Sequence, residues 1–422
     1  MSPTGAPAVE LLTIGDELLL GFTNDTNGAY LARRLAELGV ALARRTSVGD
    51  TVDAIVAAIR EALDRTGAVI TTGGLGPTED DMTRDAVAVA FGRALELDEA
   101  HMNWMRERWR KRFGRDMPES NRRQALLPMG ARKLENRHGS APGAFIEDDR
   151  GRWLVMLPGV PREMRGMTED TVIPLLRDRF AGAAGNSIRS RTLRTTGIGE
   201  SAIADRVEAD ATLRSLKGEG SLAYLPGVDG TDLRITRSGP DVDAALERAA
   251  RALYAVIGEF VYGENTEDLA AVVLDLCRRK RVRVAVAESC TGGLLGARLT
   301  AIPGSSDVFV GGVIAYANDA KRDALGVTEA DLRSHGAVSE EVVRAMAEGA
   351  RNRFGADLAL SITGIAGPDG GTAEKPVGLV WICAAYRDRF EPRKLQLWGD
   401  REEIRYRSAQ AAMDLARRML SD

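Results

Sequence analysis

The sequence predicts an α/β protein with three domains in its 422 residues. Apolar runs of strand length alternate with stretches of helical periodicity at both ends of the chain, which is typical of sheets flanked by helices. Between about residues 186 and 265 the pattern changes to that of a small α+β module. The chain is also too long for one hydrophobic core. We therefore predict domains at 1–180, 186–262 and 266–422.

In the N-terminal domain, strands alternate with helices, which predicts a parallel sheet. The elements are strands 9–14 and 68–72, helices 27–38 and 55–63, and a further strand that begins at Trp153 and leads into the tight loop 157–161. The basic segment 101–137 surrounds Trp104 and Trp109. Runs of charge are usually exposed faces, so we expect an exposed helix there.

The middle and C-terminal domains differ in the direction of their strands. Strands 190–195 and 232–238 alternate like antiparallel strands, and a helical stretch follows each. In the C-terminal domain the strand and helix alternation returns. Its predicted elements are helix 266–279, strand 282–287, a helix from Gly292, strand 308–316, helix 339–354, and strands 358–363 and 378–385.

Composition excludes several classes of function. The formal net charge of -4 gives no general attraction to nucleic acid or anionic membranes. No apolar run could span a membrane, and the N-terminus does not resemble a signal peptide, so we expect a cytoplasmic protein. The three cysteines form no CxxC pair and the three histidines form no HExxH motif, so disulfide, zinc and histidine chemistry are not indicated.

The C-terminal domain contains a candidate nucleophile, Ser289, in Ala287-Glu-Ser-Cys-Thr-Gly-Gly293 at a strand-to-helix junction. Serine needs a base, and no histidine is near it in sequence. Tyr316-Ala-Asn-Asp-Ala-Lys321 offers a lysine that burial could deprotonate and a tyrosine that could relay the proton. The N–H groups of Gly292 and Gly293 could form an oxyanion hole or a phosphate cradle. The alternative is that Ser289 only caps the helix.

A second glycine-rich stretch, Thr363-Gly-Ile-Ala-Gly-Pro-Asp-Gly-Gly-Thr372, leaves a strand and suits close approach to a phosphate. Together the motifs AESCTGG, PGSS, YANDAK, LGV, TGIAGPDGGTAEKPVG and WGDREEIR resemble the C-terminal domain of the competence/damage-inducible CinA family. The resemblance covers 266 to the end of the chain and implies hydrolytic deamidation of nicotinamide mononucleotide (NMN) to nicotinate mononucleotide and ammonia.

The same resemblance assigns roles to residues of this domain. It implies Ser289 as the nucleophile, Lys321 as its base and Tyr316 as the proton relay, with no cofactor. We expect Cys290 to be only a small packed residue. The residues expected to bind substrate are Thr291, Gly292, Gly293, Ser305, Thr363, Gly364, Ile365, Ala366 and Gly367.

The N-terminal domain contains a second glycine loop, Thr71-Thr-Gly-Gly-Leu-Gly-Pro-Thr-Glu-Asp-Asp81. Its glycines and the following helix suit a phosphate, and a divalent cation could offset the repulsion by its carboxylates. The expected phosphate contacts are Gly73, Gly74, Gly76 and Thr78, and the expected metal ligands are Glu17, Asp80 and Asp81. The alternative is that these acidic residues merely cap helices.

This domain also resembles the CinA family, in a domain related to the molybdopterin-binding fold. The matching stretches are TIGDELLLG, TSVGD, TTGGLGPTEDD, TRDAVA, NRHGSAPG and LPGVPREM, with Ser140 where the family typically has threonine. The resemblance implies an ADP-ribose pyrophosphatase that needs a divalent metal (Mg, Mn or Co) and, in some members, K+. The metal would neutralise charge on the pyrophosphate.

The middle domain, with Thr196-Gly-Ile-Gly-Glu200, resembles the KH-like domain of the same family. A nucleic-acid clamp would need basic neighbours, but Glu200 and Asp205 are acidic, so we expect a structural connector.

The leading hypothesis is a pyridine nucleotide salvage enzyme that acts on NMN and ADP-ribose and forms a homodimer, with neither nucleic acid nor membrane as a partner. The alternatives are a non-catalytic N-terminal nucleotide-binding module and a DNA-uptake partner protein.

Overall fold

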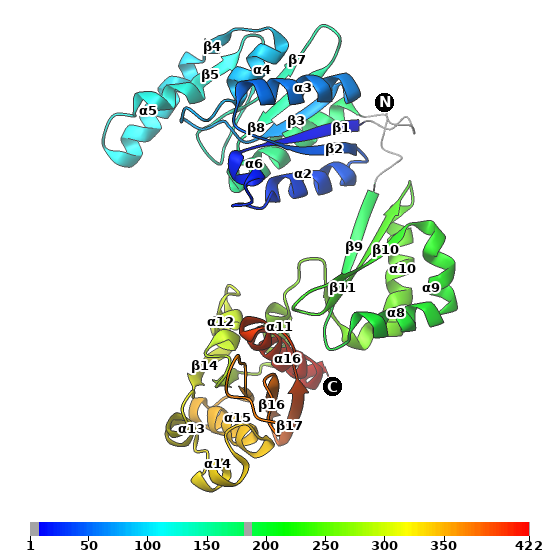
Figure 1. Cartoon of the computed structure of the whole chain (residues 1–422), viewed down its shortest axis with the longest axis vertical. Coiled ribbons are helices and arrows are strands. Elements are labelled where there is room, and N and C mark those ends of the chain that lie inside the picture. The colour runs from blue at the N-terminus through cyan, green and yellow to red at the C-terminus, as the bar shows by residue number, and fades with distance from the viewer. Residues whose placement is uncertain (1–7, 181–187, 422) are drawn as a thin grey trace. The chain divides into compact units, whose positions relative to one another are not determined.

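The structure is a computed structural model that describes residues 8–180 and 188–421. The chain divides into two compact units, which are described separately below (Figure 1). The first is Met1–Arg189 with Ser238–Val242, and the second is Ser190–Arg237 with Asp243–Asp422. The predicted middle and C-terminal domains therefore share one unit.

The first unit is built on a six-stranded sheet with the order β2-β1-β3-β8-β7-β6. The first four strands are parallel, as predicted, whereas β7 pairs antiparallel with β8, and β6 pairs antiparallel with β7. The strands are β1 (Ala8–Ile14), β2 (Ala41–Val48), β3 (Ala68–Thr72), β6 (Arg132–Leu134), β7 (Gly143–Glu147) and β8 (Trp153–Leu157), and β4 (Leu95–Leu97) pairs separately with β5 (Leu126–Pro128).

Helices cover both faces of this sheet. They are α1 (Asp16–Leu19), α2 (Thr26–Glu37), α3 (Val52–Thr66), α4 (Thr83–Phe91), α5 (Glu99–Phe113), α6 (Pro161–Met167) and α7 (Ile173–Arg179). Successive residues of a strand point to opposite faces. Leu11 accordingly packs in the cluster that contains Leu31 of α2, and Leu12 packs in the cluster that contains Ile55 of α3. Every residue of β1 and β3 is buried because both faces are covered.

Part of the basic segment forms the predicted helix, α5. Met102 and Met105 on its inner side are buried, whereas Trp104 is 39% exposed. The guanidinium of Arg108 lies 5.1 Å from the centre of the Trp104 ring. The expectation of an exposed helix is therefore confirmed for 99–113.

The second unit begins with the small α+β module that the sequence predicted. Its sheet has the order β10-β11-β9-β12, with antiparallel pairing of β10 to β11 and of β12 to β9. The elements are β9 (Ile188–Thr195), α8 (Glu200–Ala209), α9 (Ala211–Ser215), β10 (Ser221–Pro226), β11 (Thr231–Ser238), α10 (Val242–Ile257) and β12 (Val261–Glu264).

The C-terminal part of the second unit has a mixed sheet with the order β14-β13-β15-β16-β17. The first three strands are parallel, and β16 and β17 are antiparallel additions. The elements are α11 (Leu269–Lys280), β13 (Val284–Glu288), α12 (Leu294–Thr300), β14 (Phe309–Ile314), α13 (Asn318–Leu325), α14 (Glu329–His335), α15 (Glu340–Phe354), β15 (Leu358–Gly364), β16 (Leu379–Tyr386), β17 (Arg389–Gln396) and α16 (Arg401–Ser421).

The long helix α16 was not predicted, although it contributes much of this core. Met413, Ala416 and Leu420 are buried and share a cluster with Leu274 of α11 and Leu360 of β15. Because β13, β14 and β15 are parallel, their carboxyl ends lie along one edge of the sheet. The loops that follow these three strands therefore converge, which places the candidate site.

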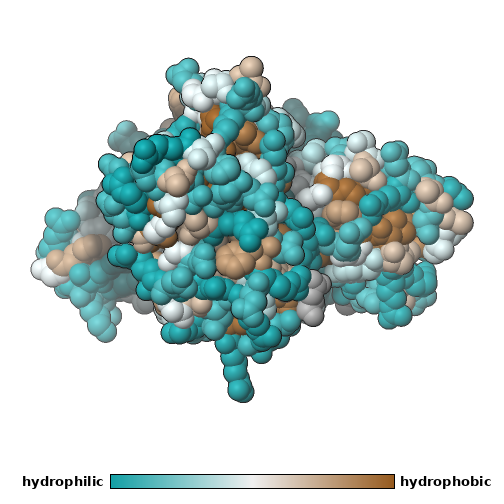
Figure 2. All heavy atoms as spheres, turned by 90° about the horizontal axis from the view of Figure 1, so that it is seen from below, coloured by the Kyte–Doolittle hydropathy of each residue, from teal (hydrophilic) through white to brown (hydrophobic). Residues whose placement is uncertain are grey.

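Within the described residues, no helix combines the length and the hydropathy that crossing a membrane requires. Figure 2 agrees for the face that it shows: hydrophilic side chains cover most of that surface, and they separate the hydrophobic side chains into small patches.

Candidate active site

Ser289 lies directly after β13, at the edge where the three parallel strands end. Its backbone N–H donates to the carbonyl of Ile362 in β15 (2.9 Å), and the N–H of Ala315, just after β14, donates to the Glu288 carbonyl (2.7 Å). The turn that carries Ser289 is thus fixed by both neighbouring strands. The Ser289 side chain is largely buried, with the residue 8% exposed.

The preceding residue, Glu288, caps helix α12. Its carboxylate is buried and accepts hydrogen bonds from the N–H groups of Gly293 (3.0 Å), Leu295 (3.0 Å) and Gly296 (2.8 Å). A negative charge at a helix N-terminus is favourable, which accounts for a buried carboxylate there. Ser289 is not the cap, so the alternative function predicted for it is wrong, and its hydroxyl is not used in capping. In the sequence, the signal that Ser289 would not cap the helix was the glutamate that precedes it in AESCTGG.

The expected oxyanion donors are already engaged. The N–H of Gly292 donates to the Ser289 carbonyl (3.0 Å), and that of Gly293 donates to Glu288. By contrast, the N–H groups of Cys290 and Thr291 donate to no other described residue. The buried hydroxyl of Thr291 also has no partner in the described part of the chain. Donors for a substrate oxygen are therefore available one and two residues after the serine, rather than at the glycines.

Lys321 is brought to Ser289 by helix α13. Its side chain is almost completely buried, at 1% exposure, and Nζ lies 3.0 Å from Ser289 Oγ. Two backbone carbonyls, of Ala315 (2.8 Å) and Tyr316 (3.3 Å), complete the surroundings of the amine. No carboxylate of the described residues forms an ion pair with it, and burial lowers the pKa of Lys321.

This geometry suits the neutral form of the amine. A neutral lysine has two N–H donors and one lone pair. If both donors go to the carbonyls of Ala315 and Tyr316, the lone pair is left for the proton of Ser289. The two side chains predicted as nucleophile and base thus lie within hydrogen-bond distance of each other.

The Tyr316 hydroxyl is placed differently from the prediction. The side chain is 62% exposed, and its hydroxyl accepts a hydrogen bond from Arg401 (3.0 Å). Among the described residues it forms no hydrogen bond to Ser289 or Lys321. The expected relay is therefore not assembled, because the contact of Tyr316 with Lys321 runs through its backbone carbonyl.

Two arginines of α16 hold the loops of the site together, and the sequence reasoning missed both. Arg401 donates to the Gly367 carbonyl (2.5 Å) as well as to Tyr316, and Arg405 donates to the Thr291 carbonyl (2.7 Å). Both occur in the motif WGDREEIR, but only the fold shows that this segment is a helix that packs beside the Ser289 turn.

The glycine-rich loop after β15 lies beside Ser289, as expected from its strand. The Thr363 hydroxyl donates to the Ala337 carbonyl (2.8 Å), and the N–H of Ile365 donates to the Leu379 carbonyl (2.9 Å). Arg401 binds the same loop at the Gly367 carbonyl. Gly364 and Ala366 therefore lie between two anchored residues, Thr363 and Gly367. The loop is positioned to approach a substrate with its backbone.

Ser305 does not belong to this site, which corrects the prediction. It precedes β14, whose first residue, Phe309, pairs with Val284 at the start of β13. Ser289 follows the other end of β13, so about five strand residues, roughly 17 Å, separate the two serines. Cys290 is buried beside Ser289, and burial raises the pKa of its thiol to about 11, so it stays protonated near neutral pH.

In the N-terminal domain the predicted loop closes on itself through Asp81. Its carboxylate accepts hydrogen bonds from the N–H groups of Gly76 (2.6 Å) and Thr78 (2.9 Å) and from the Thr78 hydroxyl. Gly73 has φ +109°, and a Cβ there would lie 2.1 Å from the Ile14 carbonyl oxygen. Gly74, at φ +63°, would likewise collide with Thr83, so both positions require glycine.

A buried arginine supports this loop from below. Arg84, in the first turn of α4, is 2% exposed and donates to the carbonyls of Leu75 (2.6 Å) and Gly76 (3.4 Å). Burial lowers its pKa to about 10, which still leaves it charged near neutral pH. The loop therefore has a fixed positive charge next to it. Sequence reasoning missed Arg84, although it lies within the motif TRDAVA.

The predicted metal ligands do not form a metal site, although Glu17 and Asp80 both lie near enough to Asp50 to raise its pKa. Glu17 and Asp80 are exposed, and Asp81 is used inside the loop. In the ranges that the structure describes, no group of three or more histidine, cysteine or acidic side chains is arranged to hold a metal ion. Asp50, which was not predicted, is partly buried near Asp16, and burial raises its pKa. The residues as placed do not fit a bound divalent metal.

Comparison with known proteins identifies the family. The chain is 57% identical over 413 residues to the "CinA-like protein" of Gemmatimonas aurantiaca, covering 97% of this chain and 96% of that protein. It is 42% identical over 414 residues to the "Putative competence-damage inducible protein" of Caldicellulosiruptor saccharolyticus, covering 97% and 98%. The chain belongs to the CinA family.

Family models match all three segments of this CinA chain. They are the "Probable molybdopterin binding domain" at 10–178, the "Damage-inducible protein CinA KH domain" at 190–263 and the "CinA C-terminal domain" at 266–420. Among solved structures, the competence/damage inducible protein CihA from Agrobacterium tumefaciens is 41% identical over 36% of this chain and 94% of its own, with a TM-score of 0.35.

The Asp81 contacts predict a stability effect in the N-terminal domain. Asp81→Asn replaces one acceptor oxygen with a donor that faces N–H groups, so we expect it to lower the free energy of unfolding by about 1–3 kcal/mol. Chemical denaturation of the full chain, followed by a probe in this domain, measures the change. Glu79→Gln, an exposed neighbour, is the matched control and should have no effect. Equal stability of the two variants would contradict the structural function of Asp81.

Proposed function

We propose that this CinA chain hydrolyses the carboxamide of NMN at Ser289, releasing ammonia and nicotinate mononucleotide. The observation that carries the proposal is the buried Lys321 amine, which lies 3.0 Å from Ser289 Oγ with no acidic partner among the described residues. A serine activated by a neutral lysine is suited to acyl transfer.

The first half of the reaction forms an acyl-enzyme. Ser289 Oγ attacks the carboxamide carbon while Lys321 Nζ takes the hydroxyl proton, and the carbonyl becomes a tetrahedral oxyanion. The N–H groups of Cys290 and Thr291 are the free donors that would stabilise it. Lys321 then gives its proton to the leaving nitrogen, ammonia departs, and an ester links the nicotinoyl group to Ser289.

The second half repeats these steps with water. Lys321 accepts a proton from the attacking water, and the collapse of the second tetrahedral intermediate breaks the ester. The proton returns to Ser289 Oγ and the carboxylic acid leaves. The sum is one amide and one water converted to one acid and one ammonia, with the enzyme unchanged.

The charges around the site support an anionic substrate. Arg401 and Arg405 bind the carbonyls of the two loops on either side of Ser289, and no cofactor is needed to supply positive charge. A nucleotide phosphate placed near these guanidinium groups would leave the carboxamide free to reach Ser289.

For the N-terminal domain we propose nucleotide binding at the loop that Asp81 closes. The N-terminus of α4 and the charge of Arg84 favour a phosphate, whereas the N–H groups of Gly73, Gly76 and Thr78 are already engaged, by the Leu157 carbonyl and by Asp81. ADP-ribose hydrolysis with a divalent metal stays a prediction. The acidic residues of the described chain, as placed, do not fit a metal. The test is incubation of the full chain with ADP-ribose, with and without Mg, Mn or Co, followed by product identification. Hydrolysis products would show turnover, and unchanged ADP-ribose would leave binding alone.

Removing the nucleophile or its base should abolish deamidation. Ser289→Ala removes Oγ, and Lys321→Met keeps the length and burial of the chain without a basic nitrogen. We expect each to reduce kcat by roughly 10²-fold or more, as for loss of a general base. Ammonia release from NMN is the assay. The double variant should be little worse than either single one, because the two groups act as a unit.

Lys280→Met provides the control, since Lys280 is an exposed lysine at the end of α11. It should retain full activity. Near-normal activity in folded Lys321→Met would show that another group, such as a water, takes the Ser289 proton.

The lowered pKa of Lys321 predicts the pH dependence of the rate. Protonated lysine cannot accept the serine proton, so kcat/KM should be low in acid and rise as Lys321 deprotonates. The inflection should lie below the pKa of free lysine, ~10.4. A profile of kcat/KM against pH measures it. A rate that falls on deprotonation would indicate that the ammonium form is the active one.

Deamidation should not depend on a metal, because Ser289, Lys321 and the backbone donors supply the nucleophile, the base and the oxyanion contacts. EDTA treatment of the full chain, followed by removal of the chelator, should leave ammonia release from NMN unchanged. Loss of activity that added metal restores, in protein shown to be folded, would overturn the serine mechanism.

A further inference from the structure

The second unit contains a large groove that the proposed reaction does not use. Its volume is about 910 Å³, which is in the range of small-molecule sites. The loop 196–200 of the KH-like module and the turn between β10 and β11 form one wall, and β17 and α16 form the other. Neither Ser289 nor Lys321 lines it.

The loop Thr196-Gly-Ile-Gly-Glu200 therefore faces this groove. A Cβ on Gly197 would lie 3.5 Å from the side chains of Asp414 and Arg418 in α16, so the loop approaches that helix closely. The loop leads into α8, a ten-residue helix whose cap, Gly199, provides no side-chain hydrogen bond. Donors at this helix N-terminus are open to a ligand in the groove.

A buried amide provides the second observation. Gln410 is 2% exposed and lines the groove, and its Oε1 accepts a hydrogen bond from Arg298 (2.8 Å). Its Nε2 is buried and has no partner among the described residues. Two N–H donors of a buried amide without an acceptor are costly, so an acceptor is expected there.

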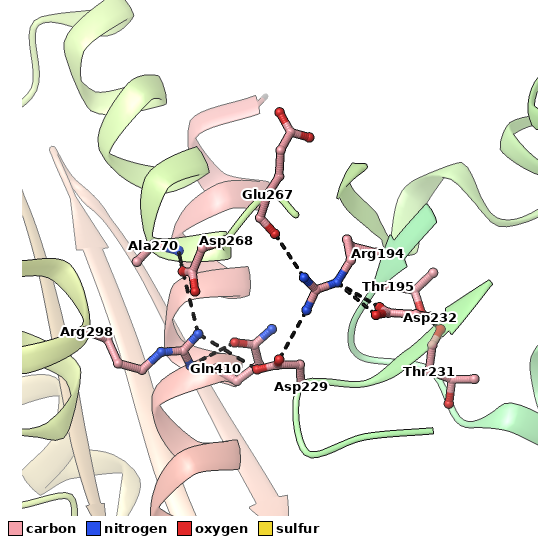
Figure 3. Close-up of polar contacts among 10 residues, drawn as sticks. All are labelled: Arg194, Thr195, Asp229, Thr231, Asp232, Glu267, Asp268, Ala270, Arg298 and Gln410. Atoms are coloured by element: carbon pink, nitrogen blue, oxygen red, sulfur yellow. Dashed lines mark hydrogen bonds and ion pairs between the residues drawn. The ribbon is translucent and has the colours of Figure 1, made fainter. Parts of the chain in front are cut away.

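Surrounding ion pairs hold this amide in its orientation (Figure 3). Arg298 also lies 3.9 Å from Asp229 and 3.8 Å from Asp268. Asp229 is held in turn by Arg194 of β9 (3.2 Å). Arg298 donates to Gln410 Oε1 and so fixes which way the amide faces. If the amide flipped, its nitrogen would face Arg298, which is also a donor and could not accept its hydrogen bonds.

A neighbouring part of the same wall combines an aromatic ring with positive charge. Trp398 is 71% exposed, and the guanidinium of Arg407 lies 3.5 Å from the centre of its ring. Arg393 and Lys394 of β17 also line the groove. A tryptophan with an arginine over its face is a platform on which a flat heterocycle can stack, and the basic side chains suit a phosphate.

We propose that this groove binds a single nucleotide, with its heterocycle at Trp398, its phosphate at Arg393 and Lys394, and an acceptor atom at Gln410. Glu200, Asp229, Glu391 and Asp414 also line the groove, and these carboxylates would repel an extended polyanion such as RNA. The KH-like loop then forms one wall of a small-molecule site. Adenine nucleotides and nicotinamide nucleotides both combine a flat heterocycle with a phosphate, so both fit this description.

Isothermal titration of the full chain tests this, with AMP and NAD+ as probes and ribose 5-phosphate as the probe without a base. We expect saturable binding of at least one nucleotide and weaker binding of ribose 5-phosphate. Trp398→Ala and Arg393→Ala should each raise the Kd of the nucleotide by about tenfold, as for loss of a stacking or phosphate contact. Both side chains are largely exposed, so the variants should fold.

Arg333→Ala replaces another exposed arginine, on α14; it is the control and should leave the Kd unchanged. Binding of AMP or NAD+ at the N-terminal loop would survive both groove substitutions. The proposal is overturned if no nucleotide binds with Kd below ~1 mM or if both groove variants bind as the unaltered chain does. It is also overturned if ribose 5-phosphate binds as tightly as the nucleotides, or if a single-stranded oligonucleotide binds more tightly and loses affinity in the same variants.

Discussion

The C-terminal site depends on one constraint, the burial of the Lys321 amine without a negative partner. An ammonium in such a place loses its hydration and gains only carbonyl dipoles, so burial lowers the pKa of Lys321. The two carbonyls that accept from it, of Ala315 and Tyr316, lie at the end of β14, and Ser289 lies at the end of β13. Parallel pairing of these strands is therefore what places the lysine amine beside the serine hydroxyl.

The remaining contacts keep this arrangement rigid. Glu288 satisfies the first N–H groups of α12, which leaves the donors at Cys290 and Thr291 free. Arg401 and Arg405 attach the loops after β13 and β15 to α16. Through these hydrogen bonds they hold the two loops in place around Ser289.

The two glycine loops of the chain differ in where their polar groups point. The loop after β3 directs the Asp81 carboxylate onto its own N–H groups, which stabilises the loop but removes an expected metal ligand. The loop after β15 is held from outside by Arg401 and Ala337, so its backbone can face a ligand. Similar sequences therefore support different chemistry in the two domains.

The sequence alone determined the positions of the main strands, the strand-to-helix turn at Ser289 and the resemblance to the CinA family, and it predicted that Lys321 would lie beside Ser289. These follow from local periodicity and from motifs contiguous in the chain. Tertiary structure decided what each polar group contacts: the glycine N–H groups were engaged, Ser305 lay at the opposite sheet edge, Tyr316 faced Arg401, and the acidic residues of the described chain formed no metal site. Those outcomes depend on partners far away in the chain, such as Arg401 for Tyr316, and hydrophobic periodicity contains no information about which distant polar groups will meet.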